Sequence, residues 1–190
     1  MSENMSIKFE ELIENGQSEF FGQSLNFDKL EDKNFKSLNF FQSELEGISF
    51  IKSVFENLSI KSCFIKGIDF SNCEFFDSYA TNYTFENCNF NFATFKTSDF
   101  SGGGFDQVNF TNATFIECDF ALCEFQKCNF DNAKFNNCNF NASIFEETTF
   151  ENTIFTNSTF KFIEGLDENT MKEMEIKGAT VCPPYEIALK

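Results

Sequence analysis

Cysteines are the residues of this 190-residue sequence that could most readily do chemistry, because thiolates bind metal ions and form disulfides. Three of the eight, Cys118, Cys123 and Cys128, follow one another at a spacing of five. The next residue at this spacing is Ala133, and the sequence contains no histidine that could complete a metal site. Four more cysteines share the spacing: Cys63, Cys73, Cys88 and Cys138. One explanation covers all seven, namely that they are small buried side chains of a repeating core.

Catalytic groups are scarce. Without histidine, no side chain titrates near pH 7 in its ordinary range, and Ser101-Gly102-Gly103-Gly104 is only a weak match to a phosphate-binding loop. Carboxylates such as Glu46 and Glu86 occur at positions that we expect to be exposed. We therefore expect no enzyme, no cofactor and no metal.

The charge balance points to a protein partner. The net charge is −16, and duplex binding depends on basic residues that neutralise phosphates, so direct nucleic-acid binding is not expected. Such acidity favours a partner with a basic surface, although it would also keep a protein with 31 Phe soluble. No segment reaches the roughly 20 apolar residues of a membrane span, and we expect a cytoplasmic protein with reduced thiols and no membrane contact.

Phenylalanine recurs at every fifth position. Between Phe40 and Phe160 it fills 21 of 25 such positions, which we call repeat centres. The exceptions are Leu45, Ile60, Ile65 and Ala80. The residue two before the centre is small in 20 of the 25 units. The residue two after it is Asn or Gly in about half of them, as turns require. A period of five fits neither a helix nor an isolated strand.

Units such as Cys128-Asn129-Phe130-Asp131-Asn132 resemble the A(D/N)LXX consensus of the pentapeptide-repeat family in its Phe-centred form. The resemblance implies an all-β solenoid, a right-handed quadrilateral parallel β-helix with four units per coil and about six coils. Stacking at roughly 4.8 Å per coil gives a rod about 30 Å long. We expect an N-terminal cap at 1–35, the β-helix at 36–162, and a C-terminal helix and tail at 163–190.

Residues 20 apart then share a column. Tyr83 falls between Cys63 and Gly103, and Tyr is too large for a small inward position. We interpret Tyr83, Gly103 and Ala80 as a local repacking that conserves volume, with a ligand cleft at Tyr83 as the alternative. Cys118 and Cys138 stack within reach of a disulfide, but parallel side chains give it poor geometry.

Both ends need covers, since an open β-helix end exposes apolar layers and unpaired backbone groups. Phe9, Leu12 and Ile13 predict a short N-terminal capping helix, and the segment from Asp167 to Lys177 predicts a second helix. Relatives carry a dimer contact at the C-terminal end, so the resemblance implies a homodimer there; a folded-back tail is the alternative. The candidate residues for either contact are Leu122, Phe162, Met171, Met174, Tyr185, Ile187 and Leu189.

Acidic residues concentrate on one of the four predicted faces. Within the repeats this face has seven, against two, three and four on the others, and only Lys66 and Lys127 oppose them. The candidate partner-binding residues are Glu44, Glu46, Glu86, Asp106, Glu124, Glu146 and Glu147. Stacked like charges repel one another, which favours a functional origin for the stripe.

Size, acidity, Phe centres and a helical C-terminal end resemble the Qnr and MfpA group of the family, especially its loop-free members. That resemblance implies a rod that mimics DNA, binds DNA gyrase or topoisomerase IV, and modulates it or protects it, as in quinolone or toxin resistance. The alternative is a structural or scaffolding interaction module whose partner is unrelated to gyrase.

Overall fold

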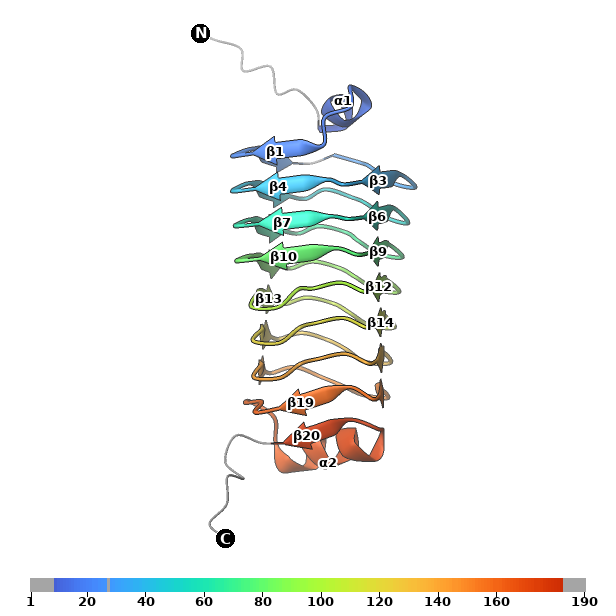
Figure 1. Ribbon diagram of the computed structural model, residues 1–190, viewed down its shortest axis with the longest axis vertical. Coiled ribbons are helices and arrows are strands. Elements are labelled where there is room, and N and C mark those ends of the chain that lie inside the picture. Colours follow the sequence, from blue (N-terminus) through green and yellow to red (C-terminus); the bar gives the residue numbers. More distant parts are fainter. Residues whose placement is uncertain (1–8, 27, 183–190) are drawn as a thin grey trace.

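The computed structural model describes residues 9–26 and 28–182, which form a parallel β-helix with a helix at each end (Figure 1). Paired residues on neighbouring turns are 20 apart, as in Phe85↔Phe105 and Phe105↔Phe125. The pentapeptide period therefore sets a turn of 20 residues with four faces, and the predicted β-solenoid is confirmed.

Three of the four faces contain strands. The first face has β1 (Glu19–Phe21), β4 (Asn39–Phe41), β7 (Ser59–Lys61), β10 (Tyr79–Thr81), β19 (Thr159–Lys161) and β20 (Thr180–Cys182). The second face has β2 (Ser24–Asn26), β5 (Glu44–Glu46), β8 (Phe64–Lys66), β11 (Thr84–Glu86), β13 (Gly104–Asp106), β15 (Glu124–Gln126) and β17 (Ile144–Glu146). The third face has isolated bridges such as Asn89↔Asn109. The fourth face has β3 (Asn34–Lys36), β6 (Val54–Glu56), β9 (Glu74–Phe76), β12 (Thr94–Lys96), β14 (Thr114–Ile116), β16 (Lys134–Asn136) and β18 (Ile154–Thr156).

Stacked phenylalanines fill the interior. The rings of Phe110 and Phe130, one turn apart on the same face, lie 4.8 Å apart and within 1° of parallel. Centres on adjacent faces meet edge to face, as Phe115 and Phe120 do at 84°. Aromatic pairs favour both arrangements, so one residue type can fill every layer of the core.

The small inward position is polar for a structural reason. Ser43 Oγ donates to the Phe20 carbonyl at 3.2 Å, and Thr153 Oγ1 donates to the Phe130 carbonyl at 2.8 Å. Cys73 Sγ makes the corresponding bond to the Phe50 carbonyl at 2.8 Å. Where this position holds Ser, Thr or Cys, a short side chain with a donor can therefore join its turn to the turn above it while filling little volume.

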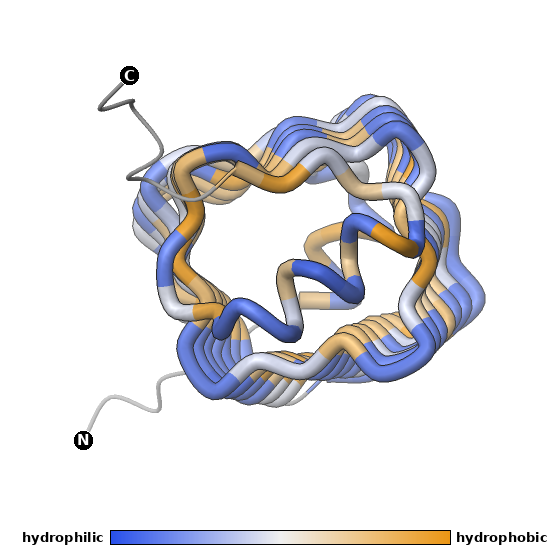
Figure 2. The backbone as a smooth tube through the Cα atoms, turned by 90° about the horizontal axis from the view of Figure 1, so that it is seen from below, coloured by the Kyte–Doolittle hydropathy of each residue, from blue (hydrophilic) through white to orange (hydrophobic). Residues whose placement is uncertain are grey.

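A helix covers each end of the tube. Helix α1 (Phe9–Glu14) places Phe9 edge to face on Phe20, with ring centroids 4.9 Å apart. Helix α2 (Glu168–Ile176) crosses the opposite opening (Figure 2) and buries Met174 against the core. Both capping helices were predicted. Neither helix in the described part of the chain is long and apolar enough to cross a membrane.

The β-helix begins earlier than the repeat pattern predicted. Strands β1 and β2 and the start of β3 lie in the segment 1–35 that was expected to form the cap, and the solenoid has about eight turns where six were expected. Phe20, Leu25, Leu30 and Phe35 do continue the spacing of five. Two positions before Leu25, Leu30 and Phe35, however, stand residues that are not small: Gln23, Asp28 and Lys33. The repeat pattern therefore did not extend to these turns. These three residues are tolerated because no turn lies above them, and all three remain exposed or half-buried.

Candidate functional site

The parallel register aligns the predicted acidic residues on the second face. One column, formed by the last residue of each strand, reads Asn26, Glu46, Lys66, Glu86, Asp106, Gln126 and Glu146. Glu44 and Glu124 lie in the parallel column formed by the first residue of each strand, and Glu147 occupies the corner after β17. Glu86 and Asp106 are half-buried, whereas the other five carboxylates are exposed. We call these seven residues, as given in the sequence prediction, the acidic face.

Lys66 interrupts this face. Its Nζ lies 2.8 Å from Glu86 Oε1, and this hydrogen bond, followed by the charge of Glu86, raises the pKa of Lys66. The ion pair separates Glu44 and Glu46 from the carboxylates of the C-terminal turns. The stripe is therefore two groups of negative charge and not one continuous row.

The remaining carboxylates of the acidic face have few partners. Within residues 9–26 and 28–182, no hydrogen bond or ion pair engages the side chains of Glu44, Glu46, Glu124, Glu146 or Glu147. Asp106 has only a 3.5 Å contact with the amide of Gln107. A shallow groove of about 280 Å³ lies among them, between Glu124 and Glu146, with Ile144 and Gln126 in its lining.

Several acidic residues on the first and third faces have structural partners instead. Asp69, Asp99 and Asp119 each accept a hydrogen bond from the backbone N–H two residues later, at 2.8–2.9 Å. Asp131 accepts from the N–H of Glu151 at 2.7 Å. These carboxylates replace a missing backbone acceptor, so folding alone accounts for them. No such account applies to the acidic face.

The extra N-terminal turns reduce the contrast in charge between faces. They place Asp28, Glu31 and Asp32 around Leu30 on the third face and add no acidic residue to the second. The number of carboxylates thus distinguishes the second face from the others less clearly than the repeat region alone indicated. The lack of structural hydrogen bonds to most carboxylates of the acidic face distinguishes it better.

The inward cysteines pack as predicted. All seven are buried, and their thiols donate to backbone carbonyls, as Cys123 does to Phe100 and Cys128 to Phe105. Burial raises the pKa of Cys73, Cys88, Cys123 and Cys128 to about 12. No disulfide forms, and no group of three or more potential ligands among the described residues could hold a metal.

Sequence comparison identifies the repeats. Residues 105–141 and 134–163 match pentapeptide repeats, in eight copies. This part of the chain therefore consists of the repeats of the pentapeptide-repeat family.

Solved structures with similar folds include full-length QnrB1, a plasmid-mediated fluoroquinolone resistance protein. It is 15% identical over 83% of this chain and 93% of that chain, with a TM-score of 0.46. HetL, involved in heterocyst differentiation regulation in the cyanobacterium Nostoc sp. strain PCC 7120, is 10% identical over 80% and 93%, with a TM-score of 0.35. Rfr23 from the cyanobacterium Cyanothece 51142 is 13% identical over 83% and 96%, with a TM-score of 0.37. At these identities the likeness is one of fold alone. No curated protein matches the sequence.

In this pentapeptide-repeat protein Tyr83 fills space that its neighbour leaves. A Cβ added to Gly103 would overlap with the Tyr83 ring, and the Tyr83 hydroxyl donates to the Phe100 carbonyl. The ring is only 4% exposed, which agrees with the predicted repacking of Tyr83 and Gly103.

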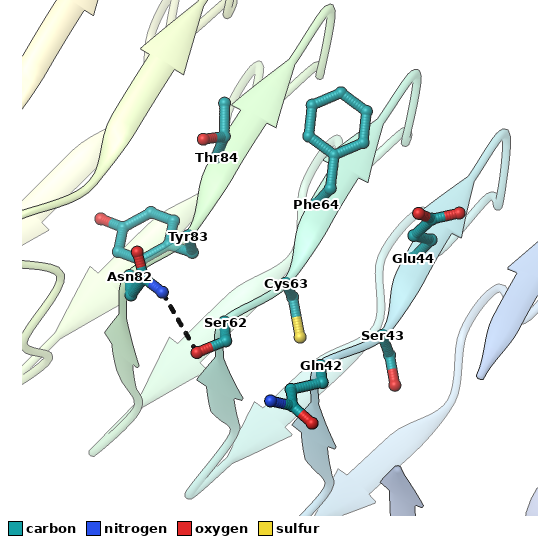
Figure 3. Close-up of a pocket in the computed structure, with 9 residues that line it drawn as sticks. All are labelled: Gln42, Ser43, Glu44, Ser62, Cys63, Phe64, Asn82, Tyr83 and Thr84. Atoms are coloured by element: carbon teal, nitrogen blue, oxygen red, sulfur yellow. Dashed lines mark hydrogen bonds between the residues drawn. The ribbon is translucent and has the colours of Figure 1, made fainter. Parts of the chain in front are cut away.

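A groove of about 510 Å³ runs along the corner beside Tyr83 (Figure 3). Its lining residues are Gln42, Ser43, Glu44, Ser62, Cys63, Phe64, Asn82, Tyr83 and Thr84. Phe64 and Glu44 project from neighbouring strands on its outer side, and Asn82 donates to Ser62 Oγ at 3.2 Å. Because the Tyr83 ring and hydroxyl are engaged in packing, the groove offers mainly short polar side chains.

The candidates for a dimer or tail contact divide into three groups. Leu122 and Phe162 are 66% and 49% exposed, so they remain available. Met174 is 1% exposed inside the cap, and Met171 packs partly against the core, so Met174 was wrong as a surface contact. The reason is that α2 must turn its apolar side to the open end of the tube. Tyr185, Ile187 and Leu189 lie outside the described residues.

Sequence reasoning missed several exposed aromatic residues. Phe21 is 64% exposed and packs against Phe41, with ring centroids 5.2 Å apart, and Lys61 Nζ lies 5.5 Å from the Phe41 ring centroid. Phe92 is 56% exposed at a corner. Aromatic residues at outward positions of the repeat were the available signal, but they are inconspicuous among the many Phe repeat centres.

Proposed function

We propose that this chain is a non-enzymatic protein-binding solenoid whose acidic face binds the basic surface of a DNA-binding protein. The best candidate is a type II topoisomerase, DNA gyrase or topoisomerase IV, whose activity the protein would modulate or protect. The observation that carries the proposal is that five carboxylates of the acidic face make no hydrogen bond or ion pair within the described part of the chain, namely Glu44, Glu46, Glu124, Glu146 and Glu147.

Repulsion makes such an arrangement costly for folding. Neighbouring strands lie about 4.8 Å apart, and like charges directly opposite each other destabilise a sheet. Glu86 and Asp106 are such a pair, and only Glu86 has a lysine beside it. A partner that supplies lysine or arginine side chains would remove this repulsion and gain from the fixed spacing.

The spacing also supports mimicry of DNA. A duplex carries charge regularly, with a rise of roughly 3.4 Å per base pair. The rungs of the β-helix fall between that rise and the longer distance between successive phosphates. Carboxylates fixed on these rungs would therefore present negative charge at multiples of one spacing to a surface that normally binds the DNA backbone.

The test is a supercoiling assay of gyrase, with a parallel decatenation assay of topoisomerase IV, titrated with the protein with and without a quinolone. The test variant replaces Glu44, Glu124 and Glu146 by Gln and Asp106 by Asn, which keeps the Lys66–Glu86 pair intact. The control variant replaces Glu19, Glu74, Glu117 and Glu151 by Gln, which changes the charge equally on the other three faces.

We expect the wild type and the control variant to inhibit the enzyme or protect it from the drug, and the test variant to do neither. Equal loss of the effect in the two variants would show that the overall charge, and not the acidic face, is responsible. No effect of the wild type at tens of micromolar would exclude a topoisomerase as the partner.

A scaffolding role with an unrelated partner is the second candidate, favoured by the exposed Phe21 and the half-buried Phe41 that packs against it. The two functions differ in their response to salt. Binding through the acidic face weakens steeply as ionic strength rises, whereas binding through aromatic residues does not.

A further inference from the structure

One corner of the β-helix changes character toward the C-terminal end. The corner between the first and second faces begins with polar residues and glycine and ends with three apolar residues. In order, the column reads Gly22, Gln42, Ser62, Asn82, Gly102, Leu122, Ala142 and Phe162. We call Leu122, Ala142 and Phe162 the apolar strip. All three are exposed.

The backbone at the strip does not favour these residues. Leu122, Ala142 and Phe162 have φ of 60°, 58° and 61°, in the left-handed region that Asn and Gly adopt most readily. Their N–H groups hold them there by donating to the turn below, at 2.9, 2.7 and 2.5 Å. Neither backbone preference nor solvation therefore accounts for apolar side chains in three consecutive turns.

The chain returns to this corner after α2. Strand β20 pairs with β19 in the register Phe160↔Val181 and Lys161↔Cys182, and the Phe162 N–H donates to the Cys182 carbonyl. The described chain therefore ends at Cys182, whose carbonyl is bonded to the last residue of the apolar strip. The segment 183–190 is attached at this point of the chain.

The composition of that segment matches the strip. Its sequence is Pro-Pro-Tyr-Glu-Ile-Ala-Leu-Lys, with apolar side chains at Tyr185, Ile187 and Leu189. This alternation puts the three on one side of an extended chain. Eight extended residues reach about 26 Å, whereas three rungs span only about 10 Å, which leaves enough length for the chain to reverse direction.

We propose that residues 183–190 fold back over the apolar strip of the same chain and pack Tyr185, Ile187 and Leu189 against Leu122, Ala142 and Phe162. A segment tethered directly beneath the strip has a high effective concentration there. The strip exposes on the order of a few hundred Å², below the roughly 1,200 Å² of a stable protein interface. The exposed side of α2 carries Glu168, Glu173 and Glu175 against Lys172, and this net negative charge would repel a second copy placed end to end.

Amide hydrogen exchange by mass spectrometry tests the proposal on the full chain. The test variant is Leu122→Asn/Phe162→Asn, because Asn is the commonest corner residue here and suits a positive φ, so the fold is preserved. The matched control is Phe92→Asn, which removes a 56% exposed aromatic from a corner of the third face with a φ of 58°.

We expect the amides of residues 186–189 to exchange at least about tenfold more slowly in the wild type and in Phe92→Asn than in the free peptide. In the double variant they should exchange at the rate of the free peptide, while amides of β17 and β18 stay protected. Exchange at the free-peptide rate in the wild type would overturn the proposal. So would protection that disappears on dilution together with a dimer detected by light scattering, because a second copy would then cover the strip.

Discussion

The packing of Tyr83 over Gly103 gives a quantitative test of how this solenoid conserves volume. A Cβ at Gly103 would overlap with the Tyr83 ring, and Gly103 has no positive φ that would itself disfavour alanine. Gly103→Ala should therefore destabilise the protein by about 1–3 kcal/mol through overpacking. Tyr83→Ala leaves a cavity and removes the hydrogen bond to Phe100, which costs about 3–5 kcal/mol.

The effects of the two substitutions on the free energy of unfolding should not be additive. Once Tyr83 is alanine, a methyl group at residue 103 enters empty space and restricts the unfolded chain, which stabilises by about 0.4–1 kcal/mol. The coupling between the two sites is then about 1.5–4 kcal/mol. Equilibrium unfolding in urea, followed by circular dichroism for the four proteins of the cycle, measures it.

The neighbouring glycine provides the control. A Cβ at Gly104 would meet Thr84 Oγ1 at 3.5 Å, an ordinary contact, so Gly104→Ala should leave stability unchanged or raise it slightly. If Gly103→Ala costs the same with Tyr or Ala at residue 83, the idea that one large side chain uses the space of two is wrong.

Three further predictions concern the C-terminal cap, the acidic face and the thiols. Gly165→Ala should lower the free energy of unfolding by about 1–3 kcal/mol in thermal or urea denaturation, because its φ is 87° and an added Cβ would overlap with the Phe145 carbonyl. Lys66→Gln should tighten binding to a basic partner at low salt, measured by titration calorimetry, because it removes the cation that splits the acidic face; unchanged affinity would contradict a role for this face. The buried thiols with a pKa near 12 keep their protons in the folded state at pH values where the unfolded chain, with a thiol pKa of 9.0, loses them. The free energy of unfolding should therefore be insensitive to these thiols below pH 9 and fall between pH 9 and 12. Under reducing conditions the fall at pH 10.5 should be on the order of 1–2 kcal/mol per thiol. Cys73→Ala should reduce this fall.

The sequence predicted the solenoid because its period of five, with Phe and small residues at the inward positions, resembles the pentapeptide-repeat consensus. It predicted the helices at both ends because Phe9 and Met174 lie on apolar stripes of helical period. The first turns were not predicted because Gln23, Asp28 and Lys33 occupy positions that are small elsewhere in the repeat. No turn lies above these three residues, so a small side chain is not required there. A repeat pattern read from its regular middle therefore underestimates the length of the fold at its ends.

The sequence predicted which acidic residues share one face, but it did not predict the electrostatic surface that they form. Register alone places Glu46, Glu86 and Glu146 in one column, and the sequence contains that register. The Lys66–Glu86 pair depends on side-chain reach and could not be read from spacing. Met174 was misassigned because an apolar helix stripe looks the same whether it closes its own tube or meets another subunit.

Acidic pentapeptide-repeat chains contain two kinds of carboxylate, those that support the fold and those that do not. Asp or Asn directly before a repeat centre, as at Asp99 and Asp119, accepts a hydrogen bond from the backbone N–H two residues later, and the adjacent corner depends on it. Such residues contribute negative charge to every member that uses the consensus, whatever the member binds. Glutamates such as Glu124 and Glu146 cannot be explained in this way, because their carboxylates make no such bond within the described chain. The departures from the consensus, and not the net charge of −16, therefore support the proposed basic partner.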